Sequence, residues 1–146
     1  MVKLLSLFSI LFIISSCNEN NKIYLEVLHK SSETWDGTRI SYPDGDEQIT
    51  AVKIILKPNA KLPFHCHPYP TIGYVIAGKV EVEKANGESK TFAKGDVVYE
   101  LVNSWHRGSN PSMFQKTEII AFYIGQKDSA NTVIQTVKDS PDCKTN

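Results

Sequence analysis

The sequence lacks an excess of charge of either sign. Lys plus Arg and Asp plus Glu both number 16, and the sequence pI is near 6.9. A protein that binds nucleic acid through its phosphates usually carries an excess of basic residues, which this composition does not provide. We therefore expect no nucleic-acid partner.

The sequence also lacks several signatures of enzyme chemistry. It has no Gly-rich phosphate loop, no Gly-x-Ser-x-Gly turn and no His-Glu-x-x-His helix, so nucleotide-binding and common hydrolase classes have no support. Low-complexity tracts and internal repeats are missing too. The length of 146 residues and the hydrophobic fraction of 41% instead suit one domain with a single core.

Helical periodicity is missing after the N-terminal segment. Short apolar stretches recur instead, separated by Gly, Pro and Asn turn signals at intervals of about 8 to 12 residues. The expected strands are Lys22–His29, Gln48–Lys57, Thr71–Ala77, Lys79–Lys84, a strand that opens at Gly95, and Met113–Gly125. This pattern predicts an all-β chain folded as a single antiparallel β-barrel or jelly roll.

The N-terminus has the pattern of an export signal. One Lys precedes the uncharged apolar run Leu4–Ile14. As a helix this run would reach only about 16 Å, short of a hydrocarbon core of about 30 Å. Its end, Ile14-Ser15-Ser16-Cys17, resembles the bacterial lipoprotein signal, which implies that Cys17 is lipidated and becomes the mature N-terminus. An ordinary secretory signal with a chance Cys is the alternative.

These segments define the expected organisation of the chain. It comprises a lipoprotein signal peptide at 1–16, a polar tether at 17–22, a barrel at 23–138 and a polar tail at 139–146. The lipid would be the only membrane contact and would hold the domain at the bacterial cell envelope, on the periplasmic face or the outer membrane. A homodimer is a compatible assembly.

A His-x-His pair is the main candidate for chemistry. Residues i and i+2 of a strand point to the same face, so His65 and His67 can reach one point while Cys66 points away. Neutral imidazole is the commonest metal ligand, although two exposed or core histidines would give the same pattern.

An exported compartment permits disulfides, but we expect Cys66 and Cys143, which lies in a polar tail, to stay unpaired.

The segment around this pair resembles the first motif of the cupin family. That motif runs Gly, five residues, His-x-His, three or four residues, Glu, six residues, Gly. Residues 59–78 keep this spacing, with His65 and His67 in register, Asn59 in place of the first Gly and Thr71 in place of Glu.

A later segment resembles the second cupin motif, which runs Gly, five residues, Pro-x-Gly, two residues, His, three residues, Asn. Residues 95–110 match its first Gly, its His as His106 and its Asn as Asn110. Leu101 and Asn103 replace the Pro and the second Gly. Together the two motifs indicate a small single-domain cupin.

The resemblance implies a metal inside the barrel. Cupins hold it with three His and one Glu, which here gives His65, His67 and His106 as ligands of one divalent transition metal. Thr71 is a doubtful fourth ligand, because its hydroxyl is neutral. A three-His site without carboxylate suits Zn, Fe, Ni or Cu better than the harder Mn. A vestigial site without metal is the alternative.

Glu100 precedes the third histidine by six residues and could replace the missing acid. If its side chain faces inward, it could act as a general base, as a hydrogen-bond partner of a ligand, or as a fourth ligand. If it faces outward, it is a solvated carboxylate at a sheet edge. The sequence does not decide between these orientations.

Other residues near the motifs have a weaker claim. Tyr74 and Trp105 are pocket candidates, although core packing is the usual fate of aromatic residues on barrel strands. Asn110 is expected to stabilise its turn, and His29 to lie at the surface or in the core.

The sequence and its resemblance to cupins thus predict a metal-dependent enzyme, oxygenase- or isomerase-like, acting on a small anionic molecule. The alternative is a non-catalytic binding or sensing module.

Overall fold

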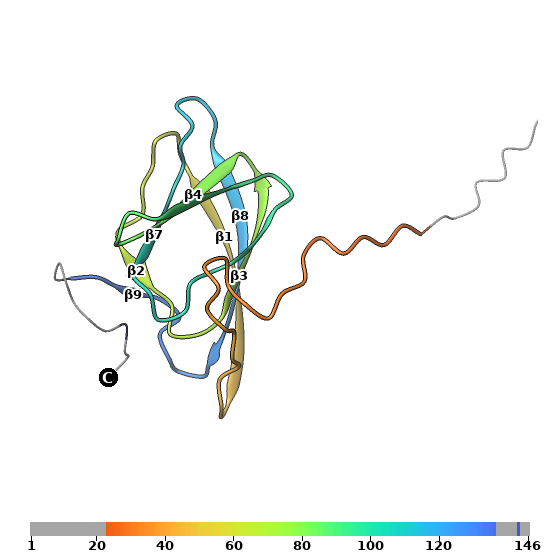
Figure 1. Cartoon of the computed structure of the whole chain (residues 1–146), viewed down its shortest axis with the longest axis vertical. Coiled ribbons are helices and arrows are strands. Elements are labelled where there is room, and N and C mark those ends of the chain that lie inside the picture. The colour runs from red at the N-terminus through yellow and green to blue at the C-terminus, as the bar shows by residue number, and fades with distance from the viewer. Residues whose placement is uncertain (1–22, 137–142, 144–146) are drawn as a thin grey trace, which may run out of the picture.

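The computed structural model describes residues 23–136 and residue 143, and within them all regular structure is β (Figure 1). One antiparallel sheet runs in the order β1 (Glu47–Leu56), β8 (Thr117–Gln126), β3 (Thr71–Ala77), β6 (Val97–Tyr99). The other runs β5 (Ser89–Ala93), β4 (Lys79–Lys84), β7 (His106–Ser109), β2 (His65–Cys66), β9 (Val133–Ile134). The predicted all-β jelly roll is confirmed.

The two sheets curve around a shared interior. Alternate residues of β3 and β8 point inward, so that Val75 is fully buried while its neighbour Tyr74 is 37% exposed. Inward side chains from both sheets form the core, which comprises Leu56, Val75, Val80, Val82, Phe92, Val98 and Ile119. The core fills one part of the barrel and leaves another part to the histidines.

Four positions where the cupin motifs place Gly have a left-handed backbone. The φ angles are 58° at Asn59, 75° at Gly78, 96° at Gly95 and 53° at Asn103. Asn tolerates this conformation better than other residues with a side chain, which explains how it replaces Gly at two of the turns. Gly78 also has no room for a side chain, because a Cβ there would lie 2.6 Å from the carbonyl oxygen of Lys116.

The strand predicted at Lys22–His29 is wrong for the part that the structure describes. Residues 23–29 form no strand, and Ile23 is 93% exposed. Strand-forming residues need a neighbouring strand that takes up their backbone hydrogen bonds, and none in the described chain pairs with this segment. The first strand of the barrel begins at Glu47.

The prediction that two cysteines stay unpaired is also wrong. Cys66 and Cys143 form a disulfide with their Cα atoms 5.9 Å apart. Strand β9 pairs with β2 on the side opposite β7, and this pairing returns the chain end to Cys66. The polar composition of the tail carries no signal for this return.

Several predicted features lie outside the described residues. They are the signal peptide at 1–16, the lipidation site Cys17 in the tether at 17–22, and the tail at 139–146 apart from Cys143. Among the described residues, no helix has the length and apolar character needed to cross a membrane.

We predict that the disulfide contributes strongly to stability, because it closes a loop with a sequence separation of 77 residues. Cys143→Ser should lower the free energy of unfolding of the oxidised protein by about 4 kcal/mol, measured by urea denaturation. Reductant should cause the same loss in the wild type and no further loss in the variant. Equal stability of the two oxidised proteins would contradict the pairing.

Candidate metal centre

The barrel brings the three predicted histidines together. His65 on β2 pairs directly opposite His106 on β7, and His67 follows two residues after His65 on the same face. The ring centroids of His65 and His106 are 4.6 Å apart, and each lies 5.1 Å from that of His67. One ring nitrogen of each histidine lies within 4.8 Å of the other two, so the three could hold a metal ion.

Backbone carbonyls orient all three rings. Each Nδ1 lies within hydrogen-bond distance of a carbonyl oxygen: Pro63 at 2.9 Å for His65, Asn131 at 2.9 Å for His67, and Ser104 at 2.7 Å for His106. A carbonyl oxygen only accepts, so we assign the proton to Nδ1 in each ring. This tautomer leaves the Nε2 lone pairs free, as metal ligation requires.

Burial keeps two of these rings neutral. It lowers the pKa of His67 to about 4, and Glu100 only partly opposes this shift. Burial, reinforced by His65, also lowers the pKa of His106 to about 4. At neutral pH both imidazoles are therefore uncharged, with a proton on Nδ1 only, and this is the state that binds a metal.

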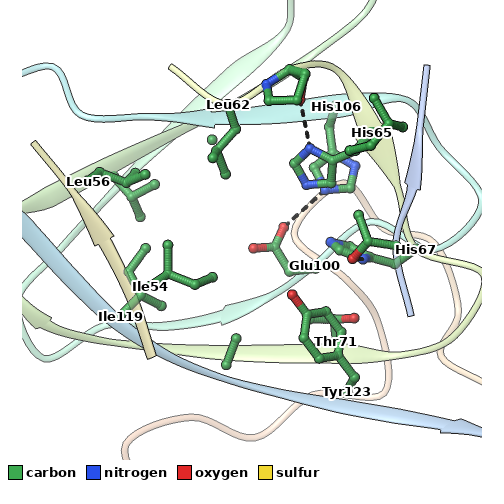
Figure 2. A pocket seen from close by; sticks show the side chains of 16 residues that line it. Ile54, Leu56, Leu62, His65, His67, Thr71, Glu100, His106, Ile119 and Tyr123 are labelled. Atoms are coloured by element: carbon green, nitrogen blue, oxygen red, sulfur yellow. Dashed lines mark hydrogen bonds and ion pairs between the residues drawn. The ribbon is translucent and has the colours of Figure 1, made fainter. Parts of the chain in front are cut away.

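Glu100 faces inward, and this settles the orientation that the sequence left open. Its Oε2 lies 3.4 Å from Nε2 of His106. Figure 2 shows the Glu100 side chain pointing toward the histidines. Burial raises the pKa of Glu100, while His67 and His65 oppose the shift. The solvated-edge alternative is thus excluded, and Glu100 belongs to the site.

A cavity of about 240 Å³ adjoins these residues (Figure 2). Its polar end is formed by the three histidines, Glu100, Thr71 and Tyr123, whose ring centroid lies 5.5 Å from that of His67. Its other wall is apolar and includes Ile54, Leu56, Leu62 and Ile119. A small number of polar groups in an apolar enclosure is typical of small-molecule sites.

The structure does not bring Tyr74 and Trp105 to this cavity. Tyr74 lies on the outer face of β3, one residue out of phase with the buried Val75. Trp105 is half-buried and is also absent from the cavity lining. Strand alternation turns both away, because each is directly adjacent to a residue that points inward.

Asn110 stabilises its turn, as predicted. It is buried, and its amide nitrogen donates to the carbonyl oxygens of Leu56, Lys57 and Gln115. Its Oδ1 accepts from the backbone of Ser112. Asn110 therefore fixes the loop between β7 and β8 and does not line the cavity.

Some site residues were not predicted. Tyr123 could have been singled out, because it shares the inward phase of β8 with Ile119 and Ala121. The segment 131–134, which includes β9, has no such signal. Its Asn131 carbonyl orients His67 across 64 residues of sequence, and its Thr132 and Ile134 line the cavity.

The donor set fits a divalent transition metal. Three imidazole nitrogens suit Zn, Fe, Ni or Cu. Among the described residues, His106 Nε2 and Glu100 Oε2 are buried without a hydrogen-bond partner. Such orphaned acceptors are costly unless a cation or a proton compensates them.

Residues 52–123 match the family model Cupin_2, described as a cupin domain, and this match places the barrel in the cupin family. None of the curated proteins compared with the sequence matches it significantly.

The solved structures that are similar include the following two. A cupin-like protein from Thermotoga maritima is 21% identical, with a TM-score of 0.53 over 60% of this chain and 64% of that one. An uncharacterized conserved protein with a double-stranded β-helix domain from Klebsiella pneumoniae is 15% identical, with a TM-score of 0.51 over 65% of this chain and 84% of that one. The chain thus spans less than two thirds of the Thermotoga protein. At these identities the similarity shows the fold alone.

Proposed function

We propose that this protein is a metal-dependent enzyme that acts on a small anionic organic molecule by an oxygenase- or isomerase-like reaction. One observation carries the proposal: three oriented imidazoles converge beside the buried Oε2 atom of Glu100 at the end of a mostly apolar cavity. A purely structural domain has no need to bury such a group.

His65, His67 and His106 would hold the metal, which when bound supplies a Lewis acid for an anionic oxygen of the substrate. The apolar wall excludes water and receives the carbon skeleton. The cavity volume of about 240 Å³ is below the roughly 300–1,000 Å³ typical of drug-sized ligands, which supports a small substrate.

The preference for an anion rests on the metal charge alone. Arg107, the nearest cationic candidate from the motif, pairs with Glu83 at 2.8 Å and lies against the ring of Phe64. It is not part of the cavity lining.

The alternative is a binding or sensing module that uses the same pocket without turnover. The two functions share the metal and the ligand, so the fold does not separate them. An assay of product formation or oxygen consumption with small carboxylates and diols separates the two functions, because only an enzyme converts its ligand.

We predict that the purified protein carries about one divalent transition metal per chain, as expected for a single three-His site. His65→Ala/His106→Ala should lose the metal and any turnover, because two of the three nitrogen ligands are removed. His29→Ala is the matched control, since His29 is exposed and contacts Tyr99 away from the cavity. Metal analysis by mass spectrometry gives the readout. Full metal content in the double variant would refute the ligand assignment.

We propose that the protein is a lipoprotein of the bacterial cell envelope, since Cys17 follows a short apolar run and two small residues. In a bacterial host, the wild type and Cys143→Ser should incorporate labelled palmitate and fractionate with membranes. Cys17→Ser should do neither. Equal labelling of Cys17→Ser would exclude this anchor.

We also propose a homodimer. The outer face of the sheet formed by β1, β8, β3 and β6 exposes the apolar side chains Ile49, Ile55, Tyr74 and Phe122. Such a patch is typical of an interaction surface. Sedimentation velocity should show a dimer that Phe122→Lys dissociates, whereas Phe114→Lys, in the loop between β7 and β8, leaves it intact. A monomeric wild type would refute the proposal.

A further inference from the structure

We propose that Glu100 is the fourth protein ligand of the metal, so that the carboxylate ligand comes from the residue after β6 and not from position 71 on β3. This inference rests on the metal site of the proposed function. It goes beyond that function because it assigns the whole protein ligand set, three nitrogens and one carboxylate oxygen.

The first argument is the mismatch between Glu100 and His106. Nδ1 of His106 donates to the carbonyl oxygen of Ser104, so Nε2 of the neutral ring has only a lone pair to offer. This lone pair faces Oε2 of Glu100 at 3.4 Å, and an ionised carboxylate also only accepts. Both atoms are buried without a hydrogen-bond partner among the described residues. Two acceptors in this arrangement require either a metal cation or a proton between them, and the separation of the two atoms and the position of Glu100 favour the cation.

The second argument is the distance itself. Ligand atoms about 2.0 to 2.1 Å from a tetrahedral metal lie about 3.4 Å from each other. The separation of 3.4 Å between Glu100 Oε2 and His106 Nε2 equals one edge of such a tetrahedron. It is long for a hydrogen bond to a buried, charged acceptor, which is usually shorter than 3 Å.

The third argument is the position of Glu100 in the sheet. Its backbone nitrogen donates to the carbonyl oxygen of Thr71 at 2.9 Å, which continues the antiparallel register past the pair Ile72 and Tyr99. Residues opposite each other in such a ladder point to the same face, and both Thr71 and Glu100 line the cavity. A carboxylate on either strand can therefore address the same point, as Figure 2 indicates.

Thr71 itself is a poor candidate for that role. Its hydroxyl donates to the carbonyl oxygen of Tyr69, at 3.4 Å. A neutral hydroxyl is also a weak ligand for a divalent transition metal beside imidazole and carboxylate. The carboxylate ligand must therefore come from the neighbouring chain segment, where Glu100 lies opposite Thr71.

The competing explanation is a positioning role, in which a protonated Glu100 donates a hydrogen bond to Nε2 of His106 only while the metal is absent, and lies beside a bound metal without ligating it. Gln separates the two roles, because it has nearly the same shape and its amide N–H can donate to His106, but it lacks the charged oxygen. The informative set is the wild type, Glu100→Gln and Glu100→Gln/Thr71→Glu.

The test is a titration of the metal-free full-length proteins with Co²⁺, followed by visible absorption, which responds to the number and type of ligands. We expect Glu100→Gln to weaken binding by about 100-fold or more, beyond the roughly 10- to 100-fold cost of losing an outer hydrogen-bond partner, with an altered spectrum. Thr71→Glu in the same chain should restore the affinity to within about tenfold of the wild type. An unchanged affinity and spectrum in Glu100→Gln would overturn the proposal.

A second measurement covers the case in which Glu100→Gln does not fold. The infrared difference between Co²⁺-loaded and metal-free wild type, with ¹³C-labelled glutamate, should show the bands of a coordinated carboxylate. Absence of these bands would overturn the assignment.

If His65→Ala/His106→Ala loses the metal while Glu100→Gln does not, only the role of Glu100 fails. If the wild type binds no metal, the proposed function fails as well.

Discussion

Strand β2 separates two functions by the alternation of its side chains. His65 and His67 point into the barrel, and Cys66 between them points away and is bonded to Cys143. A shift of one residue in the pairing of this short strand would exchange the two faces and destroy both the histidine cluster and the disulfide. The pairing of His65 with His106 on one side and with Ile134 on the other fixes this register.

The polar end of the cavity depends on hydrogen bonds that its histidines donate to backbone carbonyls. Three carbonyl groups, those of Pro63, Asn131 and Ser104, hold the imidazoles in one tautomer and turn their free nitrogens toward one point. Carbonyls in ordered loops are rigid acceptors, so the rings lose little conformational entropy when they bind a ligand. The cost of this arrangement is desolvation, which is visible in the lowered pKa values of His67 and His106.

Much of the fold and the convergence of the three histidines could be predicted from the sequence, because both depend on local spacing. The two motifs place three histidines correctly, and Asn59 and Asn103 adopt the left-handed turns that the motif reserves for Gly. The strand predicted at Lys22–His29 failed in its described part, because strand propensity does not supply a pairing partner. The bond between Cys66 and Cys143 and the contact of Asn131 with His67 were beyond sequence reasoning, since both join distant segments by a return of the chain.

The bond between Cys66 and Cys143 also sets an order on the maturation of the chain. Cys143 follows Cys66 by 77 residues and comes after β9, so the covalent ring can close only after every strand of the described barrel has been synthesised. Both histidine motifs lie inside this ring or at its start. A chain that stopped between Ile134 and Cys143 would keep every side chain of the cavity but lose the disulfide.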